Sequence, residues 1–265
     1  MLQHILVAHD LSPEADLALT RAAQLAHQHS ARLTLLHVFD GRQPAAETGA
    51  RQQLAARLAA CALPRAELLL RAGRPVEEIL LQCRGLEADL LVLGTHHRQS
   101  PEGFAGTTLE RLLQDCPTPV LLAVTAEPAP WQRALVALDY SPCASRALRR
   151  AWQLLGAGAT LHALHVHEVA AIHAGEDPAD LAFERELFDR LLADEQVALP
   201  AGGAQLSHEL RVGERASCLQ AVSAERQPQL LALGAHSRGL LADALLGSLA
   251  LEMLHQPPCD VLVVR

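Results

Sequence analysis

The sequence predicts an α/β protein made of two repeated, doubly wound, five-stranded parallel sheet domains of the Rossmann-like type. Two observations predict this class: short apolar runs alternate with amphipathic helical stretches, and the whole pattern occurs twice along the 265 residues. Alternation of this kind favours a parallel sheet covered by helices on both faces. The length also suits two domains better than one. We expect domains at residues 1–126 and 132–265, joined by the segment TAEPAPW.

The first half reads as five strands separated by helices. An apolar, partly β-branched run at residues 5–8 opens it, and Ser12-Pro13 supplies an N-cap and a first-turn proline for the helix that follows. The remaining elements are expected as strands at residues 33–38, 67–70, 90–93 and 120–124 and helices at 51–60, at 76–83 and after Gly106. Sheets of this type commonly have the strand order 3-2-1-4-5.

The second half repeats the first. Asp10 and Asp139 lie 129 residues apart, and the Ser-Pro pair after each of them recurs at the same offset. With a one-residue gap, the His-Val pair ending at Val38 meets the pair ending at Val166. The second copy is longer in its middle, where a helix is expected over residues 181–192. A repeat of this extent indicates an internal duplication.

A strand–loop–helix unit near the end of each half is the stretch that points to a ligand. In the second half it reads LLALGAHSRGLLADALLGSLALEML, with Gly234 ending the strand and Gly247-Ser248 opening the helix. We expect Gly234 to allow a sharp turn. A helix start with free N–H groups and a positive dipole end is a ready anion site. The matching loop of the first half is one residue shorter.

The Asp that ends the first strand of each half is expected to join this site. Ligands of doubly wound sheets bind at the carboxyl ends of the strands, where the strand order reverses. That point lies between the strands that end at Asp10 and Gly94, and again between those that end at Asp139 and Gly234. An Asp there can accept hydrogen bonds from a ribose or a base edge. The alternative is that each Asp is only a turn residue and each helix start only a cap.

Each half resembles a universal stress protein domain, and the whole chain is similar to the tandem two-domain members of that family. The resemblance rests on the Asp-ended first strand, the turn at Gly73-Arg74-Pro75, the loop pattern GxxGx9G(S/T) and the closing apolar strand. ATP-binding members have this loop intact, so the resemblance implies an adenine-nucleotide site for ATP, with or without Mg²⁺. Ser237 and His97 replace the middle glycine in the second and first loops. The second pocket is therefore the expected functional one.

The resemblance also implies which residues touch the nucleotide. In the second half, Asp139 would bind ribose or adenine and the Val166 backbone would meet the adenine edge. The residues implied to line the phosphates there are Gly234, Ser237, Arg238, Gly247 and Ser248. The weaker first-half equivalents are Asp10, Val38, Gly94, Gly106, Thr107 and Thr108.

Composition narrows the classes of function. A net charge of −8 argues against a nucleic-acid partner, and no apolar run approaches the roughly 20 residues that span a bilayer. The N-terminus enters a strand directly, and the six cysteines form no CxxC pair, so we expect a cytoplasmic protein that does not bind membranes. His165 and His167 share a strand face, but no further ligand stands beside them, so no metal site is expected.

These observations together predict a non-catalytic stress-response regulator that binds ATP and is recognised by a protein partner that the sequence does not identify. No Gly-x-Ser-x-Gly, GxGxxG or GxxxxGK[ST] motif is present, and no catalytic residue is assigned. Two alternatives stay open: a scaffold of the same family that has lost nucleotide binding, and a weak ATPase. The closing strands at residues 120–124 and 261–264 are expected to pair within the chain as a pseudo-dimer, with a homodimer also open.

Overall fold

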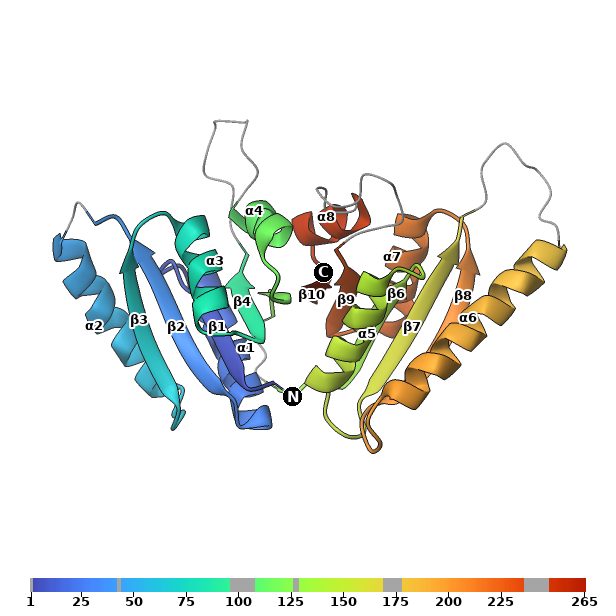
Figure 1. Cartoon of the computed structure of the whole chain (residues 1–265), viewed down its shortest axis with the longest axis horizontal. Helices are drawn as coiled ribbons and strands as arrows, with labels where there is room; N and C mark the ends of the chain where they lie inside the picture. Colours follow the sequence, from blue (N-terminus) through green and yellow to red (C-terminus); the bar gives the residue numbers. More distant parts are fainter. Residues whose placement is uncertain (1, 42–43, 96–107, 126–128, 169–177, 236–247) are drawn as a thin grey trace. The chain divides into compact units, whose positions relative to one another are not determined.

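The computed structural model contains two compact units, Met1–Pro130 and Trp131–Arg265. It describes residues 2–41, 44–95, 108–125, 129–168, 178–235 and 248–265. Within these residues each unit alternates five strands with four helices (Figure 1). The predicted α/β class is confirmed.

The N-terminal unit has strand order β3-β2-β1-β4-β5, and all its strand pairs are parallel. Its elements are β1 (His4–Ala8), α1 (Pro13–His29), β2 (Arg32–Phe39), α2 (Pro44–Ala60), β3 (Ala66–Ala72), α3 (Pro75–Gly85), β4 (Leu90–Gly94), α4 (Thr108–Asp115) and β5 (Val120–Ala123). The order reverses between β1 and β4, as the sequence predicts.

The C-terminal unit has the equivalent order β8-β7-β6-β9-β10, again with parallel pairs only. Its elements are β6 (Arg133–Leu138), α5 (Pro142–Leu154), β7 (Thr160–His167), α6 (Pro178–Ala198), β8 (Gln205–Val212), α7 (Arg215–Arg226), β9 (Leu230–Gly234), α8 (Ser248–His255) and β10 (Asp260–Val264). Its order reverses between β6 and β9.

The first helix of each unit begins where the sequence predicts. The hydroxyl oxygens of Ser12 and Ser141 accept hydrogen bonds at 3.2 Å from the backbone N–H groups of Ala15 and Ala144. A proline follows each cap at the first helical position, where its missing N–H costs nothing. These caps fix the point at which the chain leaves β1 or β6, and so they position the Asp that precedes each turn.

Two helices are longer than predicted. Helix α2 begins at Pro44 rather than residue 51, and α6 spans Pro178–Ala198 rather than residues 181–192. The residues added at the end of α6 are mostly exposed, and such helix ends carry a weak periodic signal. Trp131, which the sequence places in the linker, is buried in the C-terminal unit, where its indole N–H donates to Asp260 Oδ2 at 3.0 Å.

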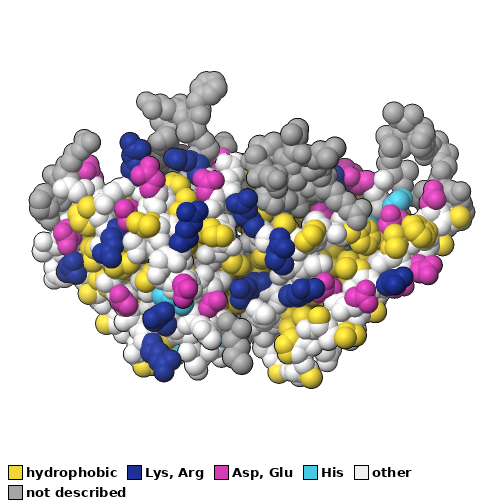
Figure 2. All heavy atoms as spheres, viewed as in Figure 1, with side chains coloured by type: hydrophobic (Ala, Val, Ile, Leu, Met, Phe, Trp, Pro, Cys, Tyr) yellow, Lys and Arg dark blue, Asp and Glu magenta, His cyan; other side chains and the backbone are white. Residues whose placement is uncertain are grey.

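Strands β4, β9 and β10 are buried along nearly their whole length and contribute to the core of their units. All five residues of β4 and of β10 are buried, as are four of the five residues of β9. Within the part of the chain that is described, no helix is both long and apolar enough to cross a bilayer. On the face shown in Figure 2, basic and acidic side chains of the described residues are interspersed rather than gathered by sign.

Candidate functional site

The C-terminal unit has a cavity of about 420 Å³ at the carboxyl ends of its central strands. Asp139, Val166 and Gly234 all line it, and so do Leu249 and Ala250 in the first turn of α8. The arrows of β7 and β8 in Figure 1 end on the side where α8 lies. The cavity therefore lies at the reversal of strand order, where the sequence predicts a ligand.

Asp139 is held in a tight turn directly after β6. Its Oδ1 accepts a hydrogen bond from the Ser141 backbone N–H at 3.0 Å, and the side chain is half-buried. Tyr140, between them, has φ 63°, in the left-handed region. A side chain in that conformation costs roughly 1–2 kcal/mol. Leu11 has the same conformation after Asp10, with φ 72°, so both units keep this strained turn at the cavity.

The end of β7 offers backbone groups to the cavity. Pairing of β6 with β7 stops at Leu138 and His165, whereas pairing of β7 with β8 continues to His167 and Val212. Val166 therefore lies one residue beyond the end of the pairing between β6 and β7. A ligand edge can take the place of β6 at this position.

Close packing, rather than the predicted sharp turn, explains why glycine is required at Gly234 and Gly94. Neither has a left-handed φ, so neither position uses the conformational freedom that a sharp turn would ask of glycine. A Cβ on Gly234 would lie 2.8 Å from the Ala144 backbone nitrogen, and one on Gly94 would lie 2.4 Å from the Glu14 carbonyl oxygen. The first turn of α5 or α1 packs directly on the strand end, and this close packing requires glycine.

One wall of the C-terminal cavity was not predicted from the sequence. It is formed by Tyr140, His165 and Glu184, the last from α6. The Tyr140 hydroxyl donates to Glu184 Oε2 at 2.8 Å, and the Tyr140 and His165 rings lie 4.5 Å apart between centroids. His165 Nδ1 donates to the Leu138 carbonyl oxygen at 2.8 Å, so its Nε2 is the nitrogen that faces Glu184, at 3.7 Å. This wall places a carboxylate acceptor across the cavity.

Arg215 supplies positive charge at the cavity. Arg215 is the first residue of α7. Its Nη2 lies 2.8 Å from Oε2 of Glu168, which follows β7, and both side chains are about half exposed. His167 Nδ1 lies 3.9 Å from Glu184 Oε1. The side chains lining the cavity therefore include three carboxylates, from Asp139, Glu168 and Glu184, and one guanidinium.

The N-terminal unit brings its predicted residues together around a much smaller cavity, of about 130 Å³. Asp10, Val38, Gly94 and Thr108 line it. Leu109 of α4 corresponds to Ala250 of α8, at an offset of 141 residues, and each lines the cavity of its unit. The larger leucine side chain takes up more of the N-terminal cavity.

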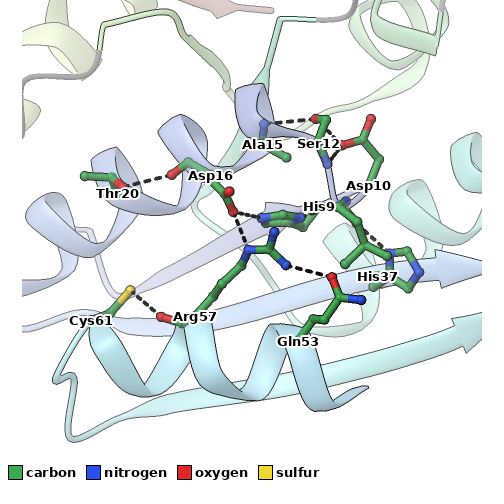
Figure 3. A network of polar contacts seen from close by, with 11 residues as sticks. His9, Asp10, Ser12, Ala15, Asp16, Thr20, His37, Gln53, Arg57 and Cys61 are labelled. Carbon is green, nitrogen blue, oxygen red and sulfur yellow. Dashed lines mark hydrogen bonds and ion pairs between the residues drawn. The ribbon is translucent and has the colours of Figure 1, made fainter. Parts of the chain in front are cut away.

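A polar network ties α1 and α2 to the end of β1 beside this smaller cavity (Figure 3). Asp16 Oδ1 lies 2.9 Å from His9 Nε2 and 2.7 Å from Arg57 Nε. His37 Nδ1 donates to the His9 carbonyl oxygen at 2.7 Å. Burial lowers the pKa of His9, although the hydrogen bond to Asp16 opposes the shift. Leu138 stands at the place of His9 in the C-terminal unit, so the contact between His9 and Asp16 has no counterpart there, although His165 donates to the Leu138 carbonyl oxygen as His37 does to that of His9.

Five predicted site residues lie outside the described residues: Ser237, Arg238, Gly247, Gly106 and Thr107. Ser248 begins α8, but its side chain is likewise not described. In the described part of the chain, no group of three or more His, Cys, Asp or Glu side chains is arranged to hold a metal ion.

Comparison with known proteins decides the family. The sequence pattern of the universal stress protein family matches residues 1–123 and again residues 130–265. The chain belongs to the universal stress protein family. It carries two such domains in tandem. A universal stress protein of Thermus aquaticus is 33% identical over 135 residues, which cover 46% of this chain and 98% of the relative. One from Synechocystis is 25% identical over 182 residues, 67% of this chain and 58% of the relative.

Solved structures of universal stress proteins share the fold of this tandem member. One from Archaeoglobus fulgidus has a TM-score of 0.73 at 20% identity and covers 100% of this chain and 99% of that chain. One from Pseudomonas aeruginosa has a TM-score of 0.71 at 22% identity and covers 99% of this chain and 93% of that chain. At these identities the likeness shows the fold alone.

Proposed function

We propose that this universal stress protein binds an adenine nucleotide, ATP with Mg²⁺, in the cavity of its C-terminal domain. The observation that carries the proposal is the 420 Å³ cavity at the reversal of strand order, with Asp139 on one side and the start of α8 on the other. Pockets for small ligands span roughly 300–1,000 Å³. The N-terminal cavity, at 130 Å³, falls below that range.

The polar groups of the cavity suit the parts of a nucleotide. The half-buried Asp139 can accept hydrogen bonds from ribose hydroxyls, and the strand end at Val166 can meet the edge of the base. The first turn of α8 presents free N–H groups, which favour phosphate. Arg215 adds a positive charge at the rim. Ser237, Arg238 and Gly247 belong to this proposal as further phosphate contacts.

The charge of the cavity gives a reason for Mg²⁺. Three carboxylates and one guanidinium line the described part of it, so a bare polyphosphate would meet net negative charge. A magnesium ion on the phosphates reduces that repulsion, and orientation of the phosphates toward α8 keeps them near positive partial charge. We therefore expect nucleotide binding to weaken strongly when Mg²⁺ is chelated.

The proposal is binding without turnover. Each carboxylate of the cavity already has a partner: Asp139 accepts from the Ser141 N–H, Glu168 pairs with Arg215, and Glu184 accepts from Tyr140. These contacts leave acceptor sites for ribose hydroxyls, and we assign none of these carboxylates as a general base. Occupancy would act by changing a surface that a protein partner in the cytoplasm recognises.

Calorimetric titration of Mg-ATP into nucleotide-stripped full-length protein tests the proposal. Asp139→Ala should weaken binding at least tenfold, about 1.4 kcal/mol, while the matched control Asp10→Ala should leave it unchanged. Equal effects of the two substitutions would refute the assignment to the C-terminal domain. Absence of binding to the stripped wild type would favour the scaffold alternative, and phosphate release over many turnovers would favour the ATPase alternative.

A further inference from the structure

One face of α6 in the C-terminal domain carries exposed apolar side chains. Four large hydrophobic residues are exposed in the part of the chain that is described, and three of them lie on α6: Phe183 at 60%, Leu187 at 38% and Val197 at 88%. The fourth, Leu81 at 59%, lies in α3. A surface helix ordinarily turns charged and polar side chains to solvent. Exposed apolar side chains that gather on one helix indicate a surface for another molecule.

The exposed face of α6 has the spacing of a coiled-coil seam. Five of its residues follow one another at steps of four, three, four and three positions: Phe183, Leu187, Arg190, Asp194 and Val197. Alternate steps of three and four keep side chains on one face, and two helices pack along such a seam. All five residues are exposed. We call them the outer seam of α6.

The opposite face of α6 attaches the helix to its own domain. Phe188 and Leu192 of that face are buried, at 1% and 3% exposure, and Glu195 is paired with Arg149. Leu192 lies two residues from both charged members of the outer seam, which places it about 160° from each of them around the helix axis. The outer seam therefore points away from the core of its domain.

Two opposite charges lie at the middle of the outer seam. Arg190 and Asp194 are one helical turn apart, yet among the described residues neither of them has an ion pair. Within a helix, an acidic residue that precedes a basic one by four positions is the more favourable order, and here the basic residue comes first. Both charges are therefore available to a partner.

An antiparallel pairing of two α6 helices matches the charged and the apolar residues of the seam at once. Residue 192 is the midpoint between Arg190 and Asp194, and it is also the midpoint between Leu187 and Val197. About a two-fold axis at this point, Arg190 of each copy faces Asp194 of the other. Leu187 of each copy likewise faces Val197 of the other. A parallel pairing would instead set each charge against its own kind, which is unfavourable.

We propose that the outer seam is a self-association surface, on which a second copy of this chain packs its own α6 in the antiparallel direction. The same residues serve both copies, so one such contact closes a dimer. The charged pair at the middle fixes register and direction, at a cost in stability relative to an apolar seam. The dimer is therefore reversible and depends on concentration. Helix α2, the counterpart of α6, has no exposed large hydrophobic residue among those described, so this surface distinguishes the C-terminal domain.

Sedimentation equilibrium of the full chain over an about hundredfold range of concentration tests the proposal. We expect the mean mass to rise from the 28.5 kDa of one chain toward twice that value. Leu187→Glu, which introduces a good helix former, should weaken the dimer at least about tenfold. Leu81→Glu is the matched control, because it makes the same change at the exposed hydrophobic residue outside α6, and it should leave the dimer unchanged. A wild type that stays monomeric, or equal effects of the two substitutions, would overturn the proposal.

Charge reversal tests the pair at the middle of the seam. Arg190→Asp should weaken the dimer, because acidic side chains then face each other across the contact. Addition of Asp194→Arg to this variant exchanges the two charges and should restore dimerisation. A double variant that dimerises no better than Arg190→Asp alone would contradict the paired charges.

Engineered cysteines test the direction of the pairing. A Leu187→Cys chain mixed with a Val197→Cys chain and then oxidised should give a disulfide between the tryptic peptides of residues 186–190 and 191–211, neither of which contains a native cysteine. Linkage of two copies of the peptide of residues 191–211 as the major product would show a parallel pairing and overturn the proposed arrangement.

Discussion

The two domains share their strand order, their capped first helix and a left-handed residue after the first strand, yet their cavities at the reversal of strand order differ in volume, about 420 Å³ against 130 Å³ among the described residues. Two of the positions that differ are Ala250, which corresponds to Leu109, and Tyr140, which corresponds to Leu11. Duplication thus keeps a cavity at the same place in the topology, while its lining side chains and its volume have diverged.

The second helix of each domain shows a related contrast. Asp16 of α1 forms an ion pair with Arg57 of α2 and a hydrogen bond with His9, which follows β1 beside the N-terminal cavity. Helix α6 is held by a two-bond ion pair between Arg149 and Glu195, at 2.6 and 2.9 Å, and by the Tyr140–Glu184 hydrogen bond at the cavity. Among the described residues, α6 contributes Glu184 to the cavity of its domain, whereas α2 contributes no residue to the smaller cavity.

The largest expected effect comes from the glycines that both domains need. Gly94→Ala places a Cβ 2.4 Å from a carbonyl oxygen, and Gly234→Ala places one 2.8 Å from a backbone nitrogen. Overpacking of this kind costs about 1–3 kcal/mol, with Gly94→Ala at the upper end. Tryptophan fluorescence reports the C-terminal domain alone, because Trp131 and Trp152 both lie there. A loss of stability detected by fluorescence in Gly234→Ala, together with one detected by circular dichroism but not by fluorescence in Gly94→Ala, would support the importance of this packing, and unchanged stability in both variants would contradict it.

The difference in cavity size can be tested by exchange of one side chain. Ala250→Leu copies Leu109 and should fill the C-terminal cavity, with a tenfold to hundredfold loss of Mg-ATP affinity, about 1.4–2.7 kcal/mol. Calorimetry measures the affinity, and tryptophan fluorescence during urea unfolding confirms that the variant is folded. Val222→Leu, at a buried position of α7 that does not line the cavity, is the control. A folded Ala250→Leu protein with wild-type affinity would show that cavity size does not separate the domains.

A smaller effect is expected at the mouth of the cavity. Tyr140→Leu copies Leu11 and removes the hydrogen bond to Glu184, whose net worth is about 0.5–1.5 kcal/mol. We expect nucleotide affinity to fall about fivefold, roughly 1 kcal/mol, because Glu184 is no longer held across the site. Leu11→Tyr is the reciprocal control and should not create a second binding site. Tighter binding in Tyr140→Leu would mean that the tyrosine blocks the cavity rather than shaping it.

The smallest effect is the pH dependence of the N-terminal domain. Burial lowers the pKa of His9, so the unfolded chain takes up this proton first as the pH falls through its unperturbed value of about 6.5. The stability that neutral His9 contributes is therefore present above that pH and is lost on acidification.

Substitution of His9 tests whether stability falls on acidification as expected. His9→Leu, which copies Leu138, removes hydrogen bonds and should be less stable than the wild type at pH 7.5, with a smaller gap at pH 5.5. Urea unfolding followed by circular dichroism, with the tryptophan signal used to identify the C-terminal transition, measures the gap. His27→Gln, at an exposed position of α1, is the control. A gap that widens on acidification would contradict the role of burial.

Much of this architecture follows from the sequence, because periodicity and capping are local signals. The duplication and the positions of Asp10 and Asp139 at the strand ends were predicted from the residues, and the strand order was expected from the type of sheet. Glu184 could not be, since it lies in the longer part of the second copy, where the first copy offers no counterpart. The role of Gly234 was misjudged because contact between the first turn of α5 and the strand end is tertiary and leaves no local pattern.

Hydrogen–deuterium exchange of the wild-type chain with and without Mg-ATP distinguishes the two domains in one sample and needs no substitution. We expect protection at the Asp139 turn, at the end of β7 and in the first turn of α8, with no change at the Asp10 turn or in α4. Protection at the Asp10 turn, alone or equal to that at the Asp139 turn, would contradict the proposed difference between the domains.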